Sequence, residues 1–221
     1  MSELFSIQLQ NRQQQGRDGI WLDLPTTTEQ VQAALRQIGI SSDNPHGLFI
    51  SGYFAEEEKR FAIPYNMVLA SNVDELNFLA SRLETLSTGE RAELNAALQV
   101  PQSELFSIGR ITDFPENVEY YVYLPDVRGP AQLGDYYLNR SGMVDMPEEW
   151  KGGIDTAQFG RYVAQQEQGV FTEYGYLVKS GDAWQKVHEG QPVPEEYRVL
   201  SFPAPEVLRD SANIPPPVQP E

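Results

Sequence analysis

Carboxylates are the most abundant reactive groups in this 221-residue chain, which has 32 Asp and Glu residues, 16 Lys and Arg residues and two histidines. A pair of carboxylates can act as acid and base in glycoside hydrolysis, so the composition offers that enzymatic arrangement. The adjacent Glu148 and Glu149 would point apart on a helix, which is poor geometry for such a pair. His46 stands in a turn-like NPHG segment and His188 in a polar one, and neither belongs to a Ser/His/Asp pattern. The sequence therefore predicts that the protein is not an enzyme.

Metal and cofactor chemistry has no support in the residue pattern. The chain has no cysteine, which excludes disulfides and thiolate metal sites. Two isolated histidines fall short of the several imidazoles that a His/carboxylate metal cluster needs. The sequence contains neither a Walker pattern nor a dinucleotide-binding glycine pattern, and Gly152-Gly153 lacks the strand-to-helix context of a phosphate loop. We expect no metal and no cofactor.

The net charge of −16 argues against nucleic acid as a direct ligand, because a duplex would be repelled at every phosphate. Tyrosines are frequent near the acidic residues. In nucleic-acid binders such rings alternate with Lys or Arg, whereas here they alternate with Asp and Glu, which indicates core packing or a protein interface. Two interpretations of the charge stay open: a surface that binds a basic groove of another protein, or a solvated surface that keeps the chain soluble.

Negative charge is densest between Asp113 and Glu173, where eleven acidic and four basic residues give a net charge of −7 over 61 residues. DNA carries one charge per about 1.7 Å of duplex, so a charge of −16 matches about 27 Å of DNA and a dimer about 54 Å. Carboxylates can imitate the charge spacing of DNA only if they are spread along an elongated body. The candidate partner-binding residues, which form a DNA-mimic surface in this interpretation, are Glu116, Glu119, Asp126, Asp135, Asp145, Glu148, Glu149 and Asp155.

The elements that must position these residues begin with a small sheet. Thr26 with Glu29 predicts a capping box for a helix that Gly39 ends. The middle of the chain is expected to be helical, with a short helix over 103–108 closed by Gly109. Three N-terminal strands are expected at 4–9, 19–24 and 47–54, and two further capping boxes pair Asn72 with Glu75 and Ser87 with Glu90.

The acidic third of the chain is expected to run strand, helix, loop, helix, strand. Gly129-Pro130 opens the first of these helices, with proline at the first helical position. Asp155 caps the second helix, Gln158 completes a capping-box spacing, and Gly169 stops the helix. The strands are expected at 119–124 and 170–178, the acidic loop at 143–153, a polar hairpin at 180–190 and an extended proline-rich tail at 203–221.

These elements predict an elongated α+β fold of three small subdomains with a flexible C-terminal tail. The expected organisation is a sheet-plus-helix subdomain at residues 1–62, a helical subdomain at 63–115, a second sheet-plus-helix subdomain at 116–180 and a polar, proline-rich extension at 181–221. The N-terminal MSELFSIQLQ lacks the basic and apolar regions of a signal peptide, and no apolar run approaches the ~20 residues of a membrane span. We expect a cytoplasmic protein with no membrane partner.

Three blocks of the sequence resemble the ArdA-type antirestriction proteins of plasmids, transposons and phages. The resemblance covers roughly Gly19 to Val178. The blocks are GIWLDLPTTTEQVQAALRQIGI with GLFISGYF, then NVDELNFLASRLETL, then LGDYYLNRSG, IDTAQFGRYV and GVFTEYGYLV.

The resemblance implies three small subdomains in an elongated chain and a homodimer built through the C-terminal part. It also implies inhibition of type I restriction-modification enzymes by occupation of their DNA-binding cleft, with neither catalysis nor cofactor. The alternative is an acidic protein-interaction module that inhibits another DNA-binding partner, such as a CRISPR effector.

Overall fold

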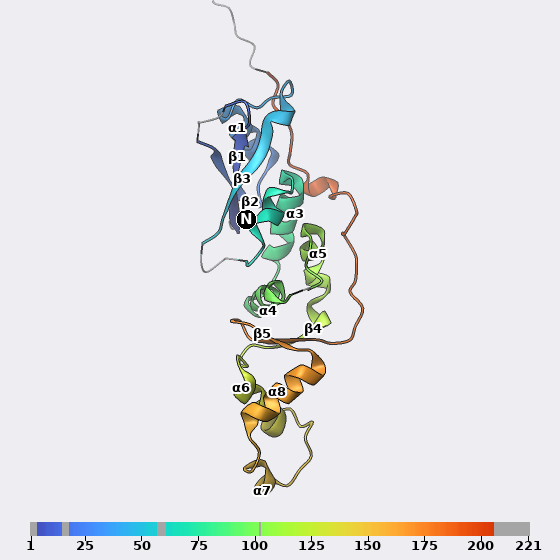
Figure 1. Cartoon of the computed structure of the whole chain (residues 1–221). Helices are drawn as coiled ribbons and strands as arrows, with labels where there is room; N and C mark the ends of the chain where they lie inside the picture. Colours follow the sequence, from blue (N-terminus) through green and yellow to red (C-terminus); the bar gives the residue numbers. More distant parts are fainter. Residues whose placement is uncertain (1–3, 15–17, 57–60, 102, 206–221) are drawn as a thin grey trace, which may run out of the picture.

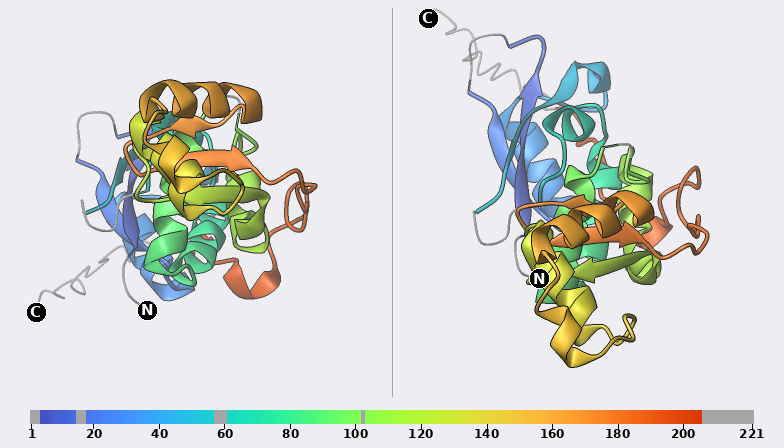
Figure 2. Two further views of the ribbon diagram at one scale, coloured as in Figure 1. Left: turned by 90° about the horizontal axis from the view of Figure 1, so that it is seen from below. Right: turned by 60° about the horizontal axis from the view of Figure 1, so that its bottom comes forward.

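The molecule is elongated, with its elements arranged along one long axis (Figure 1). A computed structural model describes residues 4–14, 18–56, 61–101 and 103–205. A first sheet with α1 forms one end, helices form the middle, and a second sheet with three helices forms the other end. Seen from below, these parts project onto one another, as expected for units stacked along an axis (Figure 2). The α+β class with two antiparallel three-stranded sheets is confirmed.

The first unit is a sheet with strand order β2-β1-β3 and one covering helix. In β1, alternate residues face the core because side chains of a strand point to opposite faces in turn. Val31, Ala34 and Leu35 of the helix are buried against this face. The elements are β1 (Phe5–Asn11), β2 (Ile20–Leu24), α1 (Thr28–Gln37), the short 3-10 helix η1 (Pro45–Gly47) and β3 (Leu48–Phe54). The three predicted strands and the helix are confirmed.

The capping box of α1 lies one residue later than predicted. The Thr27 side chain accepts the N–H of Gln30, and the Gln30 side chain accepts the N–H of Thr27. Thr26 is buried, and its N–H is already bound to the Asn77 side chain at 2.8 Å, which fixes it outside the helix. The predicted stop is confirmed, since Gly39 has a φ of +68°, a conformation that glycine adopts without strain.

The middle unit is helical, as predicted. Its helices are α2 (Tyr65–Leu69), α3 (Val73–Glu84), α4 (Thr88–Gln99) and α5 (Ile108–Thr112). The capping boxes of Asn72 with Glu75 and of Ser87 with Glu90 are both present. The short helix predicted at 103–108 is wrong: α5 starts later because the Ser107 side chain caps it by accepting the N–H of Arg110. Gly109 therefore lies inside the helix instead of closing it.

The far unit contains the second sheet, in the order β4-β6-β5, and three α-helices. Pro130 occupies the first turn of α6, as predicted, and a π-helical turn extends α6. The elements are η3 (Phe114–Glu116), η4 (Val118–Tyr120), β4 (Tyr121–Leu124), α6 (Pro130–Asp135), the π-turn η5 (Tyr136–Arg140), α7 (Glu148–Lys151), α8 (Thr156–Glu167), β5 (Val170–Phe171) and β6 (Tyr176–Lys179).

Two predictions about the end of α8 are wrong. Gln168, with a φ of +57°, is the left-handed residue that ends the helix. Gly169 follows it, and a Cβ there would lie 1.8 Å from the Tyr176 hydroxyl oxygen, so this glycine provides space. The strand predicted at 170–178 is a hairpin, because the Thr172 hydroxyl and backbone bind Gly175 and turn the chain between β5 and β6.

The capping of α8 is confirmed in part. Asp155 accepts the N–H groups of Ala157 and Gln158, as an N-cap carboxylate does. A capping box would also need a bond from the Asp155 N–H to the Gln158 side chain. The described residues do not form this bond. The apolar residues of α8 are only partly buried: Val163 packs against the core, whereas Tyr162 is 59% exposed.

Two hydrophobic cores hold the molecule together. The larger core joins the inner face of the first sheet to α1, α3 and α4, and it reaches Tyr121 of β4 and Leu177 of β6. The smaller core lies in the far unit and consists of Val127, Leu133, Ala164 and Tyr176. The packing therefore connects all three units, and the subdomain boundaries at residues 62, 115 and 180 stay a prediction.

Residues 180–205 return along the body as an extended segment, which we call the strap. In Figure 1 it leaves β6, passes the middle unit and reaches the first unit. Its only helical part among the described residues is η6 (Glu195–Tyr197), and the polar hairpin predicted at 180–190 is wrong. Of the predicted tail, Pro203 is buried and accepts the N–H of Ser42, whereas residues 206–221 lie outside the described residues.

Candidate partner-binding surface

The eight predicted acidic residues all belong to the far unit, where they follow its long axis. Glu116 and Glu119 lie on η3 and η4, next to the middle unit, and Asp126 follows β4. Asp135 ends α6 and Asp155 precedes α8. Asp145, Glu148 and Glu149 lie in the loop and helix α7 at the far tip (Figure 1). The structure therefore spreads most of these carboxylates over a surface, and only Glu116 and Glu119 share a hollow.

Four of the eight carboxylates have internal structural partners. Glu116 forms an ion pair with Arg82 of α3, and Asp155 caps α8. Asp135 accepts hydrogen bonds from Asn139 and Arg140, both at 2.8 Å, and these bonds lower the pKa of Asp135. Glu148 pairs with Lys151 at 2.9 Å, although its side chain is 81% exposed.

The other four carboxylates are free to meet a partner. Glu119, Asp126, Asp145 and Glu149 are all exposed. Within the described part of the chain, none of them makes a hydrogen bond or an ion pair. An unpaired, exposed carboxylate keeps its full charge and a mobile water shell, which a basic partner can replace. These four residues are therefore the strongest members of the predicted surface.

The structure adds one acidic residue that the sequence interpretation missed. A hollow of about 450 Å³ is lined by Glu116, Glu119 and Asp182, the last of which lies on the strap. Asp182 comes 63 residues after Glu119 in the chain. A hairpin predicted at 180–190 gave no reason to place it beside Glu119, so no local sequence signal identified it.

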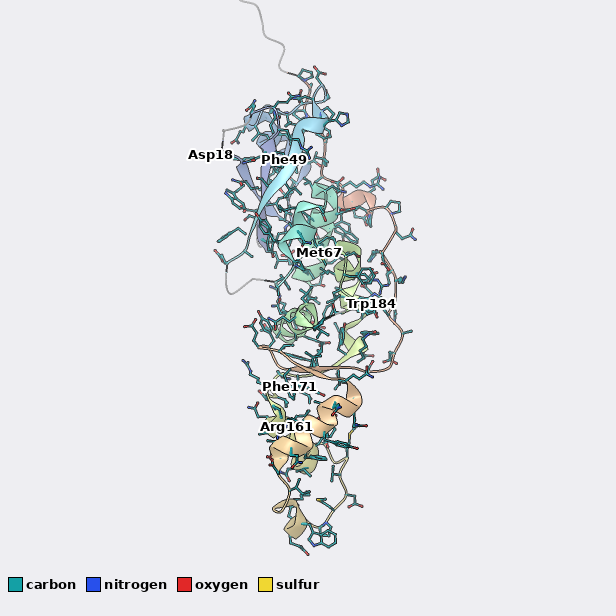
Figure 3. The ribbon with its side chains drawn as sticks, viewed as in Figure 1. Asp18, Phe49, Met67, Arg161, Phe171 and Trp184 are labelled. Carbon is teal, nitrogen blue, oxygen red and sulfur yellow. The ribbon has the colours of Figure 1, made fainter. Side chains whose placement is uncertain are left out.

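Exposed apolar and basic side chains accompany the acidic ones in the far unit. Met143 is 76% exposed and Trp150 is 66% exposed, and both lie near the tip that carries Glu149. Arg161 lies on α8 and is exposed (Figure 3). Large exposed apolar residues at the end of an acidic unit are typical of a protein-binding surface.

A second cavity holds no free pair of carboxylates for catalysis. A cavity of about 620 Å³ between α3, α5 and the strap has mostly apolar walls. Its carboxylates are Glu75, which caps α3, and Glu189, which pairs with Arg110 at 2.8 Å. Among the described residues, no group of three or more histidines and carboxylates is placed to hold a metal ion.

One buried carboxylate does have a strongly shifted pKa. Glu93 of α4 is 9% exposed, and burial together with the charge of Glu90 raises its pKa to about 8. Neither of the two cavities described above is lined by Glu93. A single buried acid without an exposed partner cannot supply both roles of an acid–base pair.

A match to a protein family shows to which family the chain belongs. The family model described as antirestriction protein (ArdA) matches residues 15–178. The chain belongs to the ArdA family. The match covers β2 and β3 of the first sheet, α1 to α8 and nearly all of the second sheet, whereas β1 and the strap lie outside it. A comparison with curated proteins finds no match.

ArdA proteins are non-enzymatic inhibitors, so membership confirms the prediction that the chain is not an enzyme. The family also implies restriction-modification enzymes as targets. The ArdA resemblance predicted from Gly19 to Val178 is therefore confirmed. Within the described residues, no helix has both the length and the apolar character to cross a bilayer.

Proposed function

We propose that this ArdA protein inhibits type I restriction-modification enzymes by occupying their DNA-binding cleft as a DNA mimic. The observation that carries the proposal is the set of four exposed, unpaired carboxylates, Glu119, Asp126, Asp145 and Glu149, within the family-matched part of an elongated body. Carboxylates that follow a long axis can meet the Lys and Arg side chains that a DNA-binding groove holds ready for phosphates.

The electrostatics of such a complex depend on the summed field. Each exposed charge contributes little, because water and salt screen it. A net charge of −16 acting together steers the inhibitor toward a basic groove and raises the rate of association at low salt. Inhibition by mimicry therefore has a steep salt dependence, in the same way as DNA binding itself.

The proposed active form is a homodimer built through the far unit, in the cytoplasm where the target enzymes act on DNA. The exposed Met143, Trp150 and Tyr162 support this assembly, because apolar side chains of this size favour burial in an interface. Two chains joined at their far ends place their acidic surfaces along one line. Their combined charge would match about 54 Å of duplex.

A restriction-protection assay in cells that carry a type I system tests the proposal. Cells that express the protein should accept unmodified DNA that control cells restrict. The purified protein should also displace a DNA duplex from the type I enzyme, and the displacement should weaken as salt is raised. Protection without displacement of DNA would contradict mimicry, and the absence of protection would contradict the proposed target.

A further inference from the structure

The strap, residues 180–205, lies just beyond the family match, which ends at residue 178. It continues directly from β6, the central strand of the second sheet, and it reaches the first unit at the opposite end of the molecule (Figure 1). Strap contacts with all three units would hold those units in one arrangement.

The first attachment is made by two side chains at the junction of the middle and far units. Asp113 is fully buried, and its carboxylate accepts the N–H groups of Val187, His188 and Glu189 at 3.3, 2.7 and 3.2 Å. A buried carboxylate is costly unless its oxygens are hydrogen-bonded, so these three amides stabilise it. Asn117 donates to the Gln185 carbonyl at 2.9 Å and accepts the Gln185 N–H at 2.7 Å.

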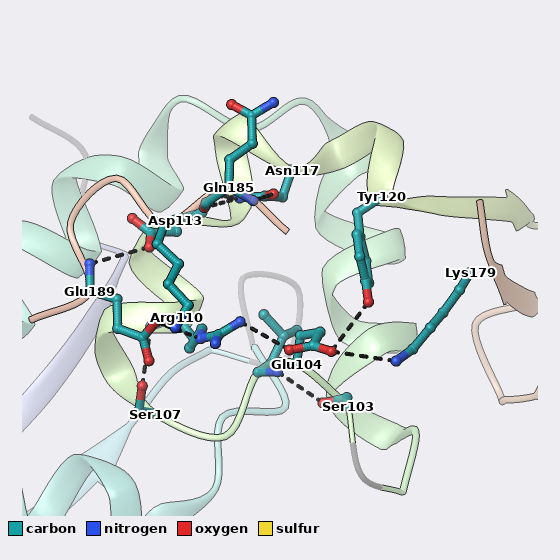
Figure 4. Close-up of polar contacts among 12 residues, drawn as sticks. Ser103, Glu104, Ser107, Arg110, Asp113, Asn117, Tyr120, Lys179, Gln185 and Glu189 are labelled. Atoms are coloured by element: carbon teal, nitrogen blue, oxygen red, sulfur yellow. Dashed lines mark hydrogen bonds and ion pairs between the residues drawn. The ribbon is translucent and has the colours of Figure 1, made fainter. Parts of the chain in front are cut away.

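A charged network strengthens this attachment (Figure 4). Arg110 of α5 is 6% exposed, donates a hydrogen bond to Glu104 at 2.9 Å and forms an ion pair with Glu189 of the strap at 2.8 Å. Lys179, at the end of β6, also reaches Glu104, at 3.4 Å. The Arg110 guanidinium lies over the ring of Trp184, which the strap places against the middle unit (Figure 3). A buried cation that lost Glu189 would be left partly unpaired, which is strongly destabilising.

The second attachment is to α3. Asp74 accepts the N–H groups of Val199 and Leu200, both at 2.7 Å. Asn77 donates to the Tyr197 carbonyl at 3.0 Å while its oxygen accepts the N–H of Thr26 from the first unit. One amide side chain therefore joins the strap, the middle unit and the first unit.

Aromatic packing accompanies these bonds. Phe78 of α3 is 5% exposed, and two strap rings cover it. The His188 ring meets it edge-on with centroids 4.9 Å apart, and the Tyr197 ring lies 4.7 Å away. Burial of apolar aromatic surface stabilises a contact, so the strap is held by packing as well as by polar bonds.

The third attachment is to the first unit. Ser42, which follows α1, donates its N–H to the Pro203 carbonyl at 2.9 Å. Gln32 of α1 donates to the Ser201 hydroxyl at 3.2 Å. The strap therefore contacts the first unit at one end, the middle unit along its length and the second sheet at its origin.

We propose that the strap is a clamp that fixes the orientation of the far unit relative to the first unit. Most of its polar bonds use its own backbone, whereas the body supplies side chains placed to receive an extended chain. The clamp itself does not depend on the proposed function. Its consequence does: if the protein is a DNA mimic, the clamp keeps the carboxylates of the far unit in line with the rest of the body.

Proline substitutions can release the clamp in the full-length chain without changing the body. Gln185→Pro removes the N–H that binds Asn117, and Leu200→Pro removes one of the two N–H groups that bind Asp74. Gln185→Ala with Leu200→Ala is the matched control, because it trims the same side chains and keeps both N–H groups. Ala183→Pro is the proline control, since Ala183 is exposed and its N–H binds no described residue.

The absence of native cysteine allows a direct measurement of orientation. Spin labels on Gln37→Cys, in α1, and Gln165→Cys, in α8, report the distance between the two ends by pulsed electron resonance. Both positions are exposed on helices. The parent and both controls should give one narrow distance peak. The double proline variant should give a broad distance distribution instead. Its circular dichroism should show that its helices are kept.

If the folded double proline variant keeps the same narrow distance peak, the clamp proposal is wrong. If that variant fails to fold, Gln185→Pro alone replaces it, and the same comparison of peak widths decides. Inhibition of a type I enzyme is measured separately on the same variants. A parent that does not inhibit refutes the proposed function and leaves the distance result standing. Full inhibition by a variant with a broad distribution refutes the role of the clamp in mimicry.

Discussion

Gly160 of α8 lies directly against the Pro130 carbonyl of α6, so closely that a Cβ on Gly160 would be 1.8 Å from the carbonyl oxygen. The two helices therefore touch backbone to backbone. Gly134 of α6 makes the reciprocal approach, since its Cβ would be 1.9 Å from the Thr156 carbonyl oxygen. This pair of glycines allows the small core of the far unit to close around Leu133 and Ala164.

Gly160→Ala should separate α6 from α8 and destabilise the protein by about 3 kcal/mol, because backbone atoms cannot move aside as a flexible side chain would. Chemical denaturation measures this difference. The matched control is Gly89→Ala in α4, where nothing lies within 4 Å of the added Cβ. That control should be neutral or stabilising by about 0.5–1 kcal/mol, because alanine favours helix over glycine. Equal effects of the two substitutions would contradict the close helix contact.

Glu93 should make the stability of the protein depend on pH. Its pKa is about 8 in the folded protein and has its ordinary value of 4.5 in the unfolded chain, so the folded state keeps a proton that the unfolded state has released. The stability due to neutral Glu93 is fully present below pH 4.5 and is lost progressively up to about pH 8.

Glu93→Gln keeps the side chain neutral and should remove this loss. At pH 8 the free energy of unfolding of the variant should be about 2 kcal/mol higher than that of the parent, a figure that allows for partial solvent screening. The advantage should shrink as the pH falls toward 5. Denaturant unfolding at several pH values measures it, and a constant difference across that range would show that Glu93 does not titrate as described.

Neutralising the four unpaired carboxylates together should weaken inhibition of a type I enzyme and flatten its salt dependence. The variant carries Glu119→Gln, Asp126→Asn, Asp145→Asn and Glu149→Gln. Each single change should cost little, because one exposed charge is screened, and the four changes should act cumulatively through the summed field. Inhibition is measured at two salt concentrations.

A second set of four substitutions separates location from total charge. Asp18, Asp43, Glu195 and Glu196 are exposed, lie outside the far unit and make no side-chain bond to described residues. Neutralising them changes the net charge by the same amount. If both sets reduce inhibition equally, total charge matters and the proposed surface does not. If neither set has an effect, mimicry itself is contradicted.

The solution shape and mass give a further check. A compact globule of this length would have a radius of gyration of about 17 Å. Small-angle scattering should give a clearly larger radius, since the units lie along one axis, and a mass of two chains (Figure 1). A monomer with the compact radius would contradict both the elongated form and the proposed dimer.

Local signals in the sequence identified most of the elements of this fold. The caps of α3 and α4 depend on residues three positions apart, and the strands of the first sheet on alternation within a few residues. Such signals act over short distances, so the sequence alone shows them. The shifted cap of α1 is different, because Thr26 is held by Asn77, which is 51 residues away.

The strap was not predictable for the same physical reason. It has little periodic apolar pattern, and its order comes from body side chains that are far away in sequence, such as Asp113, which binds residues 74 to 76 positions later. The candidate surface shows a similar limit. The sequence located the dense acidic region, but it did not show that Glu116 is paired with Arg82, which lies 34 residues earlier.

The order of synthesis gives the strap a particular place in folding. Chains emerge from the ribosome N-terminus first and tend to fold in that order. Every residue that the strap binds is made before it, so Asp113 and Asp74 are exposed to water until residues 187–189 and 199–200 arrive. A newly made chain therefore has its acidic far end before it has the strap, and the strap can dock only after the side chains that receive it have been made.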